Sequence, residues 1–314
     1  TFRKLLEDPD HIAKNLITFI NGFSPKAKEI FEYFKFEQEI EKLNKANRLY
    51  LIIKEFANID FHPSHISNIE MGYVFEELIR KFNEQANEEA GDHFTPREVI
   101  RLMAHIIYTD YDEIYKEGIV RTIYDPTCGT GGMLSVSEEY IYRNNNKANI
   151  VLFGQEYNDE AYAICTSDLL IKDEEVDNII YGDTLGDGKS FDGHPDKKFH
   201  IMKANPPFGV EWKPEEDYVR KEYNDFGFDG RFGPGLPRIN DGSLLFLLHM
   251  ISKMHKSPED GGEGSKIGII FNGSPLFTGD AGSGESNIRR WIIENDWLDA
   301  IVALPDQLFY NTGI

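Results

Sequence analysis

The chain has 314 residues, with 54 Asp and Glu against 33 Lys and Arg, so its formal net charge is −21 with His neutral. This length exceeds the roughly 250–300 residues that one hydrophobic core usually supports, and we expect a large domain with a smaller one. A hydrophobic fraction of 40% excludes general disorder. The acidity excludes broad electrostatic binding to a polyanion, because affinity for phosphates comes from Lys and Arg.

Membrane, disulfide and metal functions are not expected. The longest apolar run, Leu244 to Leu248 and just beyond, is far below the roughly 18 residues that a membrane span needs, and no signal-peptide core follows the first residues. Cys128 and Cys165 are too few for a disulfide framework, and reduced thiols in a cytoplasmic protein are the expectation. The nine His are scattered without a metal-binding pattern.

Residues 1–88 are predicted to form a helical domain, because apolar side chains such as Phe31, Ile40 and Leu49 recur with helical spacing. The polar run NEQANEEAGD indicates a linker to a second domain, residues 89–314. Just after it, Thr95 is placed to cap a new helix, with Pro96 at its first position.

From about residue 119, short β-branched runs alternate with helical stretches. This alternation predicts an α/β fold with a doubly wound, mainly parallel sheet. The expected strands are residues 119–124, 150–153, 179–181, 199–202, 267–271 and 298–304.

The segment DPTCGTGG, which begins at Asp125, lies between the first strand and a helix. Its small residues allow a ligand to approach the backbone closely, although an ordinary tight turn is the alternative. It is neither a dinucleotide fingerprint nor a Walker loop.

Acidic residues end the next two strands. Glu156 comes about 25 positions after the glycines, where doubly wound folds bind a ribose diol. Asp183 ends the third strand and can accept a hydrogen bond from the exocyclic amine of a nucleoside. Together with Asp125, these acids repel a pyrophosphate cofactor and suit a cationic one, so S-adenosylmethionine fits and NAD fits poorly. Each acid alone could also be a solvated loop residue.

The fourth strand ends in Asn205, Pro206, Pro207 and Phe208. The prolines fix the backbone and remove two N–H donors. The Asn oxygen and a proline carbonyl can both accept from one amino group, which frees the lone pair of that amine to attack a methyl donor. Phe208 can stack on the base that carries the amine, which must be flipped out of a duplex. The alternative is a strand terminator with an incidental Asn.

These motifs, DPTCGTGG, GQE, GDTL and NPPFG in this order after GDHFTPREVIRLM, resemble those of DNA amino-methyltransferases. More narrowly, the chain resembles the modification (M) subunit of type I restriction–modification systems. The resemblance implies a fold of the S-adenosylmethionine-dependent methyltransferase type and methyl transfer to N6 of adenine in double-stranded DNA. It also implies a separate specificity (S) subunit, with a second copy of this chain and a restriction (R) subunit as further candidate partners.

The resemblance assigns roles to individual residues. The catalytic candidates are Asn205, Pro206, Pro207 and Phe208. The cofactor-binding candidates are His93, Phe94, Thr95, Pro96 and Arg97, then Asp125, Gly129, Thr130, Gly131 and Gly132 at the methionine moiety, Glu156 at the ribose and Asp183 at the adenine. Members of this family usually extend beyond both ends of the chain, so a trimmed chain is expected.

Two other functions remain open. A methyltransferase acting on a glutamine amide would present a similar amine, but Phe208 in place of Tyr disfavours it. A non-catalytic scaffold is disfavoured by the intact acids and Asn205. The segment Trp212 to Arg238, rich in aromatic, Gly and basic residues, is either a loop that contacts DNA or a surface excursion.

Overall fold

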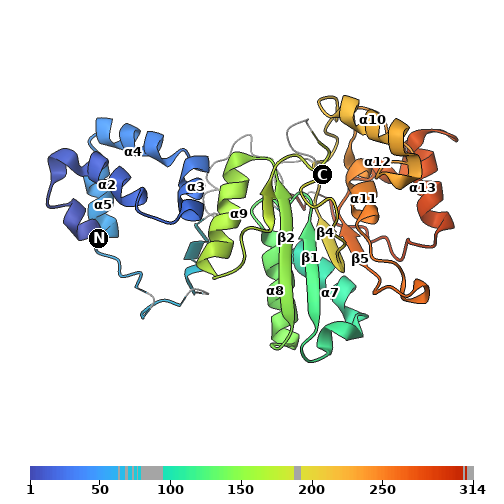
Figure 1. Cartoon of the computed structure of the whole chain (residues 1–314), viewed down its shortest axis with the longest axis horizontal. Helices are drawn as coiled ribbons and strands as arrows, with labels where there is room; N and C mark the ends of the chain where they lie inside the picture. Colours follow the sequence, from blue (N-terminus) through green and yellow to red (C-terminus); the bar gives the residue numbers. More distant parts are fainter. Residues whose placement is uncertain are drawn as a thin grey trace. The chain divides into compact units, whose positions relative to one another are not determined.

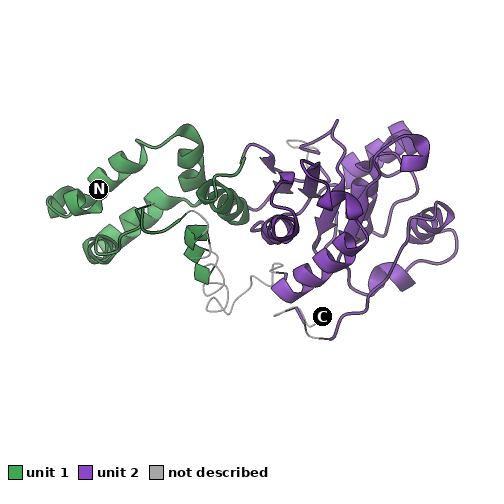
Figure 2. Cartoon of the chain, turned by 90° about the horizontal axis from the view of Figure 1, so that it is seen from below, with its two compact units in different colours: residues 1–86, 159–176 green, residues 87–158, 177–314 purple. Residues whose placement is uncertain are grey.

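The computed structural model of the chain describes residues 1–62, 64–67, 70–72, 74–75, 77–78, 95–186, 192–306 and 308–309. The chain divides into two compact units, coloured in Figure 2. Unit 1 is Thr1–Ala86 with Asp159–Val176, and unit 2 is Asn87–Asn158 with Asp177–Ile314. The predicted domain boundary near residue 88 lies outside the described residues and stays a prediction.

Unit 1 is helical, and the described part of residues 1–88 has the helices that the spacing of its apolar residues predicts. Its helices are α1 (Phe2–Leu5), α2 (Ile12–Ile20), α3 (Pro25–Tyr33), α4 (Phe36–Lys45), α5 (Leu49–Phe56) and α9 (Asp159–Ile171), with a short 3-10 turn η1 (Pro9–His11). Helix α3 begins after Ser24, whose hydroxyl accepts from the Ala27 N–H. A core that includes Ile12, Ile40 and Ile53 joins the first helices.

Unit 2 contains a parallel sheet, drawn in Figure 1. Its strands are β1 (Val120–Asp125), β2 (Asn149–Glu156), β3 (Ile179–Tyr181), β4 (Ile201–Ala204) and β5 (Lys266–Ile269). Their order is β3-β2-β1-β4-β5, and all four pairings are parallel. The chain reverses its winding between β1 and β4, and sheets of this kind bind ligands at the carboxyl ends of such strands. The predicted doubly wound parallel sheet is therefore confirmed.

Helices cover both faces of the sheet. On one face, Tyr124 and Met202 pack with Met250 of α11 (Ser243–Ser252). On the other face lie α7 (Arg97–Thr109) and α8 (Gly132–Asn144), which share an apolar cluster that includes Ile100 and Met133. The remaining elements of unit 2 are η2 (Asp112–Tyr115), α10 (Glu216–Phe226), η3 (Gly227–Asp229), η4 (Pro258–Asp260), α12 (Ser274–Phe277) and α13 (Gly284–Glu294).

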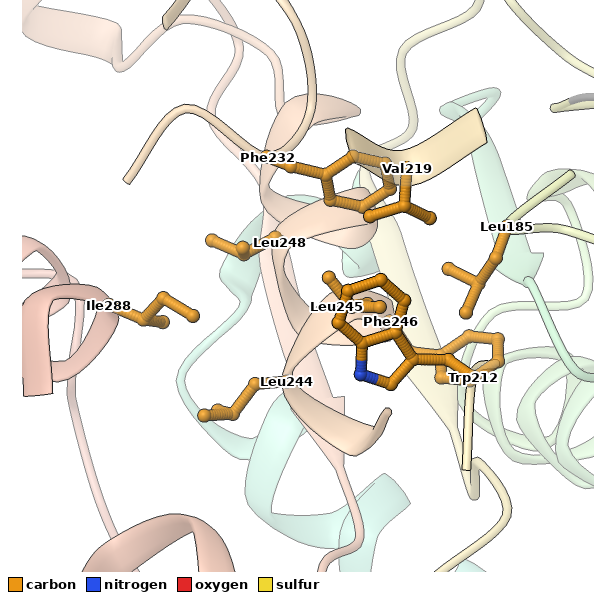
Figure 3. Packing of buried hydrophobic residues seen from close by; sticks show 9 residues of the cluster. All are labelled: Leu185, Trp212, Val219, Phe232, Leu244, Leu245, Phe246, Leu248 and Ile288. Carbon is orange, nitrogen blue, oxygen red and sulfur yellow. The ribbon is translucent and has the colours of Figure 1, made fainter. Parts of the chain in front are cut away.

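The segment from Trp212 to Arg238 is a folded layer with its own core. Trp212, Val219 and Phe232 are buried against Leu245 and other residues of α11, as Figure 3 shows. A Cβ on Gly233 would lie 2.5 Å from the carbonyl oxygen of Gly227, so the close approach of two backbones requires glycine there. The segment is thus packed onto the sheet layer rather than looped out from it.

The prediction of a strand at residues 298–304 is wrong. The backbone there is irregular and forms no strand pairing within the described ranges. Leu298 is 49% exposed and Ile301 is 59% exposed. A β-branched run favours extended backbone, but a strand also needs a neighbour with which to exchange hydrogen bonds, and among the described strands β5 pairs only with β4. No helix in the described part of the chain has the length and apolarity needed to cross a bilayer.

Candidate active site

Asn205 lies directly after β4, at the carboxyl edge of the sheet, and only 6% of it is exposed. Its side-chain Nδ2 donates a hydrogen bond to Thr95 Oγ1 at 2.9 Å. Its Oδ1 is buried and has no hydrogen-bond partner among the described residues. Buried acceptors are normally satisfied, so this orphaned oxygen indicates a site for a donor that arrives from outside the chain.

Thr95 supports this amide instead of capping a helix. The capping prediction is wrong, because α7 has Pro96 as its N-cap and no side chain closes that end. The Thr95 hydroxyl is buried and engaged by Asn205, a residue 110 positions away. Pro96 is also buried, and Arg97 begins α7 half-buried. His93 and Phe94 lie outside the described residues.

Pro206 is buried, while Pro207 and Phe208 are partly exposed. The Phe208 ring meets the Phe309 ring edge-on, with 5.9 Å between centroids, and packs on the cluster that contains Ile100 and Met133. The cluster anchors one side of the Phe208 ring, and part of the ring stays accessible.

The glycine-rich turn follows β1, beside the end of β4. Asp125 is 1% exposed, and its Oδ1 accepts from the Thr127 N–H at 2.9 Å. Gly131 has a φ of 86° and is the N-cap of α8, a conformation that favours glycine. Gly129 also has a positive φ, of 52°, and a Cβ there would meet no atom within 4 Å. The turn therefore leaves open space at the Cβ position of Gly129.

Glu156 and Asp183 organise the backbone around that turn. Glu156 Oε2 accepts from the Gly129 N–H at 2.8 Å, and its Oε1 accepts from two backbone N–H groups that follow it. Asp183 Oδ1 accepts from the Leu185 N–H at 2.9 Å. The hydroxyl of Thr184 donates to the Pro126 carbonyl at 2.5 Å, which ties the Asp183 loop to the turn. Asp125, Glu156 and Asp183 thus follow or end the adjacent strands β1, β2 and β3, at one edge of the sheet.

The electrostatics of the site include a lysine that the sequence analysis did not single out. Burial raises the pKa of Asp125 to about 7, the Glu156 carboxylate adds to this rise, and the Thr127 N–H and Lys203 oppose it. Burial also lowers the pKa of Lys203 to about 7, while Asp125 opposes this shift. The available signal was a lysine in the short apolar segment that leads into Asn205, two positions before it.

The structure brings the predicted site residues that it describes to one edge of the sheet. The turn after β1 and the Asn205 loop follow adjacent strands, and Met133 beside the turn shares an apolar cluster with Phe208. Within the ranges described above, no group of three or more His, Cys, Asp or Glu side chains could hold a metal ion.

The sheet order and this edge site define the fold of S-adenosylmethionine-dependent methyltransferases. A Listeria monocytogenes protein assigned to class I of these enzymes has the same fold, with a TM-score of 0.54, 13% identity, and coverage of 93% of this chain and 79% of that one. The chain itself belongs to the N-6 DNA methylase family, whose model matches residues 67–314.

Several proteins similar to this chain are subunits of type I restriction enzymes. The MjaIX methylase subunit of Methanocaldococcus jannaschii is 29% identical over 84% of this chain and 43% of its own length. The HindI methylase subunit of Haemophilus influenzae is 29% identical over 80% of this chain and 51% of its own length. The type I methyltransferase subunit of Streptococcus thermophilus shares the fold, with a TM-score of 0.73 and 24% identity over all of this chain and 63% of that one. The chain thus spans about half the length of these two curated relatives.

Proposed function

We propose that this chain is a DNA adenine N6-methyltransferase and acts as the modification subunit of a type I restriction–modification complex. The observation that carries the proposal is the buried Asn205 Oδ1, which has no partner among the described residues and is held at the carboxyl edge of a methyltransferase-type sheet. The family match and the names of the similar proteins support the same class of substrate.

The residues at the strand ends fit S-adenosylmethionine. Asp125 and the turn from Gly129 to Gly132 would hold its methionine moiety, Glu156 its ribose and Asp183 its adenine. Gly129 has open space at its Cβ position, and the buried carboxylate of Asp125, at the start of the same turn, suits a cationic amino group. When bound, this cofactor supplies an electrophilic methyl group.

The chain's own contribution to catalysis is positioning. Thr95 engages the Nδ2 end of the Asn205 amide and so leaves the Oδ1 end for the substrate amine. Pro206, the next residue, contributes a carbonyl without adding an N–H donor, and we expect one amine to donate to this oxygen and to Oδ1. Phe208 offers a partly exposed ring to a base that has been flipped out of its duplex. Such fixed acceptors, aligned before the reaction begins, lower the barrier without forming a covalent intermediate.

The test replaces the proposed acceptor. Asn205→Ala should reduce methyl transfer to adenine at least about 100-fold, because an oriented polar group at the reacting atom is worth several kcal/mol. Affinity for S-adenosylmethionine should stay within about twofold of wild type, since Asn205 is not assigned to the cofactor. The assay counts N6-methyldeoxyadenosine in hydrolysed duplex DNA, and calorimetry measures the affinity. Undiminished transfer by the variant would overturn the assignment.

We also propose that a separate specificity subunit reads the DNA sequence, with a second copy of this chain and a restriction subunit as further members of the complex. The similarity to type I methylase subunits supports these partners. The net charge of −21 supports a division of labour in which another chain provides most of the phosphate contacts.

A further inference from the structure

Lys203 and Asp125 are neighbours across the two central strands. Tyr124 of β1 pairs with Met202 of β4, so the next residue of each strand is Asp125 and Lys203. Neighbouring strands lie about 4.8 Å apart, and side chains alternate between the two faces of a sheet. The two side chains therefore project side by side to the face that carries α7, at the point where the strand order reverses.

Lys203 is buried away from solvent. Lys203 is 0% exposed, and its Nζ has no hydrogen-bond partner among the described residues. The ring of Tyr108, from α7, lies 5.7 Å from Nζ. Asp125 is the charged group that acts on Lys203, and Glu156, from β2, is the other charged side chain that acts on Asp125. An unpaired buried ammonium is strongly unfavourable, so the charged form of Lys203 depends on the Asp125 carboxylate.

We propose that Lys203 is a positioning residue that keeps the Asp125 carboxylate charged in the cofactor site and thereby sets the pH range in which the chain binds S-adenosylmethionine. This inference rests on the proposed role of Asp125 in holding the cofactor's amino group. Burial and the nearby Glu156 both favour the neutral acid, and Lys203 is the side chain whose charge opposes them. A neutral Asp125 would lose most of its attraction for a cationic ligand.

The experiment measures the affinity for S-adenosylmethionine by calorimetry from about pH 6 to about pH 9. Because the pKa of Asp125 is raised to about 7, wild-type affinity should fall as the pH drops through that region. Met has about the length of Lys and carries no charge. In Lys203→Met, the midpoint of the fall in affinity should therefore lie about one pH unit or more higher than in the wild type. Affinity at neutral pH should drop about tenfold and recover toward the wild-type value at the alkaline end.

Lys266→Met is the matched control. Lys266 lies on the same face of the sheet but at the amino end of β5, half-exposed, where it donates to the Asp110 carbonyl. Its loss removes one positive charge from the same sheet and should leave the midpoint where it is. In an Asp125→Asn background the cofactor should bind weakly, and Lys203→Met should no longer change the pH profile.

The outcomes separate the two proposals. A wild-type chain that binds no S-adenosylmethionine overturns the proposed function and this inference with it. If the wild type binds S-adenosylmethionine but Lys203→Met leaves the pH profile of its affinity unshifted, or shifts it to lower pH, the inference alone is overturned. If Lys203→Met does not fold, the Lys203→Met, Asp125→Asn double variant decides: recovered folding supports the charge pair, and continued failure to fold overturns it.

Discussion

At the scale of single residues, the site depends on a bond between Thr95 and Asn205 that joins two distant segments. An isolated amide can rotate by half a turn and exchange its oxygen and nitrogen. In this structure the Thr95 hydroxyl accepts from Nδ2, so the oxygen is the end of the amide that has no partner among the described residues. Thr95 is thus a positioning residue, and its effect should appear in the rate of transfer rather than in cofactor affinity.

Thr95→Val keeps the shape of the side chain and removes the hydroxyl. Because the buried Nδ2 would lose its acceptor, which typically costs about 1–3 kcal/mol, methyl transfer should fall about 10- to 100-fold. Affinity for S-adenosylmethionine should change little, and Thr95→Ser should restore most of the rate. Thr109→Val, at the other end of α7, removes a hydroxyl that donates to the His105 carbonyl and serves as the control. Equal loss of rate in both variants would show a general effect on α7.

Sequence patterns located the site residues but not all of their bonds. Cys128 packs inside the turn: it is 4% exposed, with its Sγ 3.0 Å from where a Cβ on Gly154 would lie. The acids at the strand ends were predictable because a strand followed by Asp or Glu is a local signal. The Thr95–Asn205 bond and the Lys203–Asp125 pair were not predictable, because each depends on strand order and register.

At the scale of elements, β1 to β5 overlap the predicted strands, because their short apolar runs are bounded by turns. The run at 298–304 shows the limit of this reasoning, since apolar character predicts an extended backbone without predicting a partner strand. The segment 212–238 shows the opposite error. Its Gly and charged residues are typical of a surface loop, yet Trp212, Val219 and Phe232 supply a core.

The packing of that segment can be tested with two phenylalanines. Phe232 is 0% exposed, whereas Phe228 is 70% exposed. Phe232→Ala should lower the free energy of unfolding by about 3–5 kcal/mol, because it leaves a cavity against α11. Phe228→Ala should change it by no more than about 0.5 kcal/mol. Denaturant titration followed by circular dichroism gives both values, and similar losses in the two variants would contradict the packing seen in Figure 3.

At the scale of the whole molecule, the binding of DNA depends on where the charges lie as well as on the net charge. The arginines of segment 212–238 do not form a free basic patch, because carboxylates neutralise them. Arg220 Nε lies 2.6 Å from Glu216, and Arg231 Nη2 lies 2.7 Å from Glu222. Arg238 Nη2 lies 3.8 Å from Asp241. The one region where the sequence suggested local positive charge therefore offers few charges to a phosphate backbone.

This arrangement predicts how the chain alone behaves toward DNA. Each phosphate contact from Lys or Arg releases counterions, so it makes the negative slope of log affinity against log salt steeper by about 0.9. With an acidic surface and paired arginines, the isolated chain should bind unrelated duplexes equally, with a Kd of about 1 μM or weaker near 150 mM salt. The slope should correspond to only a few contacts. Filter binding with several duplex sequences over a range of salt measures both quantities. Tight binding to one sequence by this chain alone would mean that the sequence reading lies here, and the proposed division of labour between subunits would be wrong.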